Sequence, residues 1–80
     1  MDELILEQME LAFGQTLAGR SLVDCSPDTI FGWDSLTFLN LVFLLEEALH
    51  ISFDIEDIAE MAQGGVAIAS IIAMKVGQQQ

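Results

Sequence analysis

Basic residues are nearly missing from this sequence. Arg20 and Lys75 stand against 13 acidic residues, which gives a formal net charge of -11. A chain of this charge is repelled by nucleic acid and by anionic membranes, so both are excluded as partners. We expect instead a soluble monomer that docks on basic surfaces of larger proteins.

Cysteine and histidine occur once each, as Cys25 and His50. A single cysteine forms no internal disulfide, which is typical of a reducing compartment, so we expect a cytoplasmic protein. There is no second histidine and no cysteine cluster for a metal site. Ser35 and His50 at the two ends of one helix would lie about 22 Å apart, too far for a catalytic pair. We expect no catalytic residue, no metal and no enzyme activity.

Long apolar runs are also lacking. The longest, Leu36–Leu45, contains Thr37 and Asn40 and ends at Glu46, so it is too short to span a bilayer. No basic region precedes an apolar run as it does in a signal peptide. We expect no membrane insertion, one domain at residues 1–77, and a disordered C-terminal tail at 78–80.

Apolar residues recur at helical spacing in four segments, which predicts helices at 2–18, 35–50, 55–62 and 66–74. A long first loop covers residues 19–33, and an extended connection, which alone could also be a short strand, covers 51–54. The residues expected on the inward faces are Leu6, Met9, Phe13 and Leu17, flanked by Ile5 and Ala12, in the first helix; Leu36, Leu39, Phe43 and one of Ala48 or Leu49 in the second; and Val66, Ala69, Ile72 and also Ile68 in the fourth. The fold class is therefore all-α, a four-helix bundle with a long first loop and a short third helix.

Residues 32–36, at the end of the long loop, are the stretch with a chemical signal. Ser35 falls in the first turn of the second helix, beside backbone N–H groups that have no helical partner. The helix dipole makes this position favourable for a phosphate. Asp34 has the side chain of a good N-cap. From the motif alone, an ordinary helix-terminus serine is an equal alternative.

The motif Asp34-Ser35-Leu36, followed by the run 38–47 with Glu46 and Glu47 at its end, resembles the acyl carrier proteins, and the resemblance covers about residues 3–75. It implies a bundle of acyl-carrier type in which Ser35 carries 4′-phosphopantetheine. It also implies that Asp34 and Leu36 belong to the cofactor-binding motif. The group would hold an acyl chain as a thioester for enzymes of fatty-acid, polyketide or related lipid biosynthesis.

The same resemblance implies the partners: a phosphopantetheinyl transferase (holo-carrier synthase), an acyl-loading ligase or transferase, and downstream synthase enzymes. It also implies that the second helix is the main docking element. The docking residues would be Trp33, Leu36, Thr37, Asn40, Phe43, Glu46, Glu47, Asp54, Glu56 and Asp57. Thr37 and Asn40 stand where this family often has acids, which indicates docking that is more apolar and less electrostatic.

Several alternatives remain open. An aminoacyl, peptidyl or D-alanyl carrier fits the less acidic second helix, and an unmodified carrier-like interaction module fits its apolar surface. Trp33 is a packing residue or a recognition aromatic beside the prosthetic arm. The large side chains near the space between the second and third helices either fill it or line an acyl pocket; they are Phe43, Leu44, Phe53, Ile58 and Met61.

Overall fold

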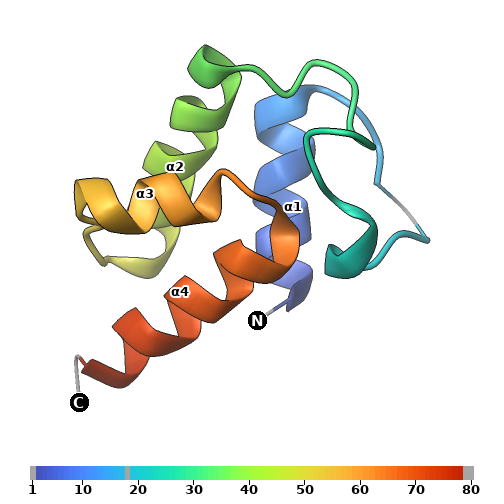
Figure 1. Ribbon diagram of the computed structural model, residues 1–80. Coiled ribbons are helices and arrows are strands. Elements are labelled where there is room, and N and C mark those ends of the chain that lie inside the picture. Colours follow the sequence, from blue (N-terminus) through green and yellow to red (C-terminus); the bar gives the residue numbers. More distant parts are fainter. Residues whose placement is uncertain (1, 18, 79–80) are drawn as a thin grey trace.

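Four α-helices and one short 3-10 turn make up the computed structural model, which describes residues 2–17 and 19–78 (Figure 1). The elements are α1 (Asp2–Phe13), η1 (Leu22–Asp24), α2 (Ser35–Leu49), α3 (Ile55–Met61) and α4 (Gly65–Gln78). No strand occurs in these ranges, and residues 51–54 form an extended connection. The all-α class is therefore confirmed. In Figure 1, α1 and α2 run antiparallel, and the start of α2 lies far from both chain ends.

The first helix is shorter than predicted, because α1 ends at Phe13 rather than continuing to residue 18. Gly14 follows it with φ +66, a left-handed conformation that stops a helix and that glycine adopts without strain. Leu17 is nevertheless buried, with 3% of its surface exposed. Its backbone N–H donates to the Glu10 carboxylate at 2.7 Å, so a side chain of α1 fixes the chain after the helix. Residue 18 lies outside the described part.

The buried face of α2 differs from the predicted one. Phe38, Leu41, Val42 and Leu45 face the core. Leu36, Leu39 and Phe43, which were expected inside, are 80%, 39% and 61% exposed. Because α2 is apolar on nearly all sides, two stripes satisfy the same helical spacing, and packing against α1 selects one of them.

The loop and the last helix meet at a pair of glycines. The Gly65 N–H donates to the Cys25 carbonyl oxygen at 2.8 Å. A Cβ atom at Gly65 would lie 2.6 Å from the Leu22 carbonyl oxygen, so this approach requires glycine. Helix α4 begins at Gly65, one residue earlier than predicted, and it continues past Met74 to Gln78. Val66, expected inside, is 57% exposed.

The core of α4 is formed by Ile68, Ile71 and Ile72. Phe53 and Met61 are also buried, and Ile58 packs against the core, so these three side chains point inward as predicted. Of the other two residues predicted near the space between the second and third helices, Phe43 is exposed and Leu44 is half-buried. Gln78, predicted in the tail, belongs to α4; residues 79–80 lie outside the described part.

Candidate functional site

Asp34 and Ser35 mark the start of α2. Asp34 has an extended backbone, and its Oδ1 accepts the Thr37 N–H at 2.8 Å, as an N-cap does. This bond lowers the pKa of the Asp34 carboxyl below its usual range, so the cap is ionised at neutral pH. Ser35 is the first residue of the helix and is exposed. A modifying enzyme therefore has access to its hydroxyl.

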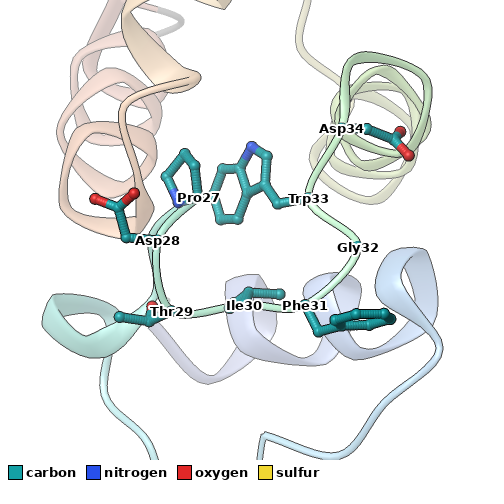
Figure 2. Close-up of a pocket in the computed structure, with 8 residues that line it drawn as sticks. All are labelled: Pro27, Asp28, Thr29, Ile30, Phe31, Gly32, Trp33 and Asp34. Atoms are coloured by element: carbon teal, nitrogen blue, oxygen red, sulfur yellow. The ribbon is translucent and has the colours of Figure 1, made fainter.

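Trp33 connects three elements beside this serine. Its indole stacks on Phe13 at the end of α1, with ring centroids 5.1 Å apart, and on Phe38 of α2, at 5.9 Å. Figure 2 shows the indole extending back across the loop toward Pro27, while the Asp34 side chain points away from the loop. Trp33 is therefore a packing residue that fixes where the loop enters α2.

A depression of about 270 Å³ lies next to Ser35. Its walls come from the loop, the first turn of α2 and the residue after α3, and it is lined by Pro27, Trp33, Asp34, Ser35, Phe38 and Ala62. The lining joins one hydroxyl and one carboxylate to aromatic and aliphatic surface. Sequence patterns indicated Trp33, Asp34 and Ser35, whereas Pro27, Phe38 and Ala62 come together only through the fold.

The loop that carries Trp33 is tied to its surroundings at several points. The Gln15 side-chain amide donates to the Phe31 carbonyl oxygen at 2.7 Å, and the Arg20 guanidinium donates to the Thr29 carbonyl oxygen at 3.2 Å. Leu22, Cys25 and Ile30 are buried and pin the loop to the core, while Val23 and Phe31 are 78% and 89% exposed. Residues 27–34 curve around an open hollow, shown in Figure 2. This loop is therefore an ordered support for the site.

On α2, an apolar surface runs from the site toward the C-terminal half of the helix. We call it the α2 groove; its lining residues are Ala12, Leu36, Thr37, Leu39, Asn40 and Phe43. Four of the residues predicted to dock, Leu36, Thr37, Asn40 and Phe43, come together here. Sequence reasoning missed Ala12, which α1 supplies, and had placed Leu39 in the core.

The acids predicted to dock are divided by the fold into two kinds. Glu46 accepts the Phe53 N–H at 2.9 Å through its carboxylate, and Asp57 accepts the Asp54 N–H at 2.9 Å. Both side chains therefore hold backbone of their own chain. Those that remain exposed are Glu47, Asp54 and Glu56. All five lie toward the end of α2 or on and before α3, away from Ser35.

Lys75 of α4 reaches this acidic end of α3. Its Nζ lies 2.8 Å from Asp57 Oδ2 and 3.5 Å from Asp54 Oδ2. The hydrogen bond from Lys75 is the main cause that lowers the pKa of Asp57, and the hydrogen bond from the Asp54 N–H is the second. The bond to Asp57 in turn raises the pKa of Lys75. No sequence pattern could have linked these distant positions.

Other chemistry is sparse in the described residues. Cys25 is buried, and burial is the main reason why its thiol pKa is raised, which opposes a role as a nucleophile. Among residues 2–17 and 19–78, no cluster of three or more His, Cys, Asp or Glu side chains is placed to hold a metal ion. None of the helices in this part of the chain has the length and apolar character to cross a membrane. Comparisons with protein-family models, curated proteins and solved structures gave no significant match.

Proposed function

We propose that this chain is an acyl carrier protein with 4′-phosphopantetheine attached to Ser35. The observation that carries the proposal is the exposed serine at the first turn of α2, within an Asp-Ser-Leu motif and directly beside a partly apolar depression. In this proposal the bundle is of acyl-carrier type, and the protein catalyses no reaction itself.

The residues at the site fit the proposed group. Ser35 offers an exposed hydroxyl for a phosphodiester, while the half-buried side chains of Trp33 and Ala62 offer surface on which a chain can rest. Asp34 is held by its bond to Thr37, so the first turn of α2 keeps the serine in place. When attached, phosphopantetheine supplies a terminal thiol that holds an acyl group as a thioester. The partners would be a phosphopantetheinyl transferase, an acyl-loading ligase or transferase, and synthase enzymes of fatty-acid, polyketide or related lipid biosynthesis.

The proposal is tested by intact mass. The purified protein is incubated with coenzyme A, magnesium and a broad-specificity phosphopantetheinyl transferase, together with the variants Ser35→Ala and Ser52→Ala. Ser52 is also an exposed serine but lies outside the site, so it serves as the matched control. We expect the wild type and Ser52→Ala to gain one phosphopantetheinyl group each and Ser35→Ala to gain none.

A gain by Ser35→Ala would contradict the proposed attachment site. If the folded wild type gains nothing, the protein is recovered from its native cell and weighed. An unmodified mass there would contradict the carrier proposal. It would favour an unmodified interaction module, for which the exposed Leu36, Leu39 and Phe43 already provide a binding surface. A modified mass there would instead indicate a dedicated transferase. An aminoacyl or D-alanyl cargo in place of the acyl group would be recognised by the mass of the loaded species.

A further inference from the structure

Ser35 lies in sequence between two aromatic residues that stack on each other. The ring centroids of Trp33 and Phe38 are 5.9 Å apart, with an angle of 13° between the ring planes. Phe38 is buried, whereas Ser35 is exposed, so the position of the serine depends on the backbone of its turn rather than on packing of its own side chain. The turn that carries the serine is therefore closed at both ends by one aromatic contact.

Local hydrogen bonds give this turn its shape. The Asp34 N–H donates to the Gly32 carbonyl oxygen at 2.9 Å, and the Asp34 carbonyl oxygen accepts the Phe38 N–H at 2.9 Å. The Asp34 carboxylate accepts the Thr37 N–H, and Gly32, with φ +83, turns the chain. All of these bonds join residues within 32–38. They define the turn, but they do not fix it to the body of the protein.

The end of α1 supplies a connection to the body. Phe13 is the last residue of α1, and its ring stacks on the Trp33 indole with centroids 5.1 Å apart and 27° between the planes. Two residues later, the Gln15 side-chain amide donates to the Phe31 carbonyl oxygen at 2.7 Å. Both contacts reach the stretch directly before Asp34. The end of α1 therefore sets where the first turn of α2 lies.

We propose that Trp33, held by Phe13, is a positioning residue for the transfer of phosphopantetheine to Ser35. This inference rests on the proposed function, because it names the residues that control the reaction at that serine. In the transfer, Ser35 Oγ bonds to the phosphorus of the phosphate of coenzyme A that bears pantetheine. The bond from that phosphorus to the oxygen of the adenosine phosphate breaks, adenosine 3′,5′-bisphosphate leaves, and the hydroxyl proton passes to a base of the transferase. The stack forms none of these bonds; it keeps the hydroxyl where the phosphorus can be reached.

The test measures single-turnover transfer from coenzyme A at increasing concentrations of a phosphopantetheinyl transferase. We expect Trp33→Ala to lower the maximal rate by at least about fivefold, because the variant presents the serine correctly less often. The half-saturating transferase concentration should change by less than about twofold, since docking is retained. Trp33→Phe keeps an aromatic ring and should restore the rate to within about twofold of the wild type. Trp33→Leu replaces Trp33→Ala if the NMR spectrum shows that the alanine variant is unfolded.

Phe13→Ala separates positioning from direct contact between Trp33 and the transferase. It should lower the maximal rate in the same way, and the double variant with Trp33→Ala should be less than about twofold slower than Trp33→Ala alone, because both residues act through one stack. Ile5→Val is the matched control, since Ile5 is fully buried in the same helix about 12 Å from Phe13; its rate should stay within about twofold of the wild type. A wild-type rate in Trp33→Ala, a loss confined to the half-saturating concentration, or fully additive losses would overturn the proposal.

A second measurement does not depend on the transfer. Hydrogen exchange followed by NMR reports on the N–H groups of Thr37 and Phe38, which both bond to Asp34. Trp33→Ala and Phe13→Ala should speed the exchange of these two groups by at least about tenfold, and that of N–H groups in the second half of α2 by less than about threefold. Equal acceleration along the whole of α2 would contradict a positioning role, because it would indicate general loss of stability.

The two proposals fail in different ways. If Trp33→Ala and Phe13→Ala are modified as fast as the wild type, the carrier function stands and the positioning role is refuted. If the wild type gains no phosphopantetheinyl group, either here or in its native cell, the carrier function is refuted and the role in transfer is refuted with it. The exchange rates then still decide whether the stack holds the first turn of α2.

Discussion

At the scale of single residues, the Lys75–Asp57 ion pair is the contact that joins the end of α4 to the start of α3. Asp57 also accepts the Asp54 N–H, and its side chain is largely buried, unlike that of Asp54. An ion pair with this second hydrogen bond and limited solvent access is less screened than an exposed pair. We infer that it orders the junction between α3 and α4.

The pH dependence of this contact has a defined sign. The pKa of Asp57 is lowered in the folded chain from an ordinary value of 3.8. The unfolded chain therefore binds more protons between the two pKa values, and the stabilisation is fully present above the ordinary value and is lost as pH falls through the lowered one. We predict that Asp57→Asn reduces the urea midpoint at pH 7, and that its difference from the wild type narrows below about pH 4.

Comparing variant with wild type at each pH is necessary, because protonation of the other acids relieves repulsion and acts in the opposite direction. Glu56→Gln serves as the control, since Glu56 is a neighbouring exposed acid and its substitution also removes one negative charge. A difference for Asp57→Asn that stayed constant from pH 7 to pH 2.5 would contradict the assignment.

At the scale of elements, α2 has two apolar faces with different roles. Leu41 is fully buried against the core, whereas Leu36 is 80% exposed in the α2 groove. We predict that Leu41→Ala lowers the free energy of unfolding by about 3 kcal/mol, since it leaves a cavity. Leu36→Ala should change it by less than about 0.5 kcal/mol, as surface substitutions do. Urea denaturation of the two variants measures both values, and similar losses would show that the faces are assigned wrongly.

The same helix shows how far sequence reasoning extends. Its start at Ser35, its cap at Asp34 and its length followed from local chemistry, because they depend on neighbouring residues. The buried face did not follow, since Leu36–Phe43 and Phe38–Leu45 have equal helical spacing and only the position of α1 distinguishes them. Gly14 was placed inside α1 for a similar reason: the pattern continued to Leu17, which is buried although it follows the end of the helix.

The candidate site divides in the same way. Asp34, Ser35 and Leu36 are adjacent in the sequence, so a local motif is enough to predict them together. Ala12, Phe38 and Ala62 contribute walls from three separate segments, and no local pattern indicates such contributions. The expected docking acids on and before α3 were identified by their charge, but the reach of Lys75 to Asp57 depends on how α4 crosses α3.

At the scale of the whole molecule, the net charge of -11 is confined to a body of 34 × 23 × 19 Å. At 0.01 M salt the Debye length is about 30 Å, so nearly all the acids repel one another; at 0.1 M it is about 10 Å, so only neighbours do. We predict that the melting temperature rises by at least about 2 °C between these salt concentrations. A divalent cation should have the same direction of effect.

Differential scanning calorimetry in sodium chloride measures this rise. The increase should shrink near pH 4, where many of the acids are protonated and less repulsion remains to be screened. A melting temperature that is unchanged or lowered at pH 7 would show that repulsion among the acids does not limit stability.

The stack of Phe13, Trp33 and Phe38 has a spectroscopic consequence. The chain has one tryptophan and no tyrosine, so its fluorescence reports on a single indole where the loop enters α2. Far-ultraviolet circular dichroism, in contrast, averages over all the helices. Unfolding curves that coincide by the two signals would show that the surroundings of Ser35 melt together with the bundle. A fluorescence transition at lower denaturant concentration than the circular dichroism transition would show that the segment around Trp33, where the loop joins α2, unfolds before the rest of the bundle.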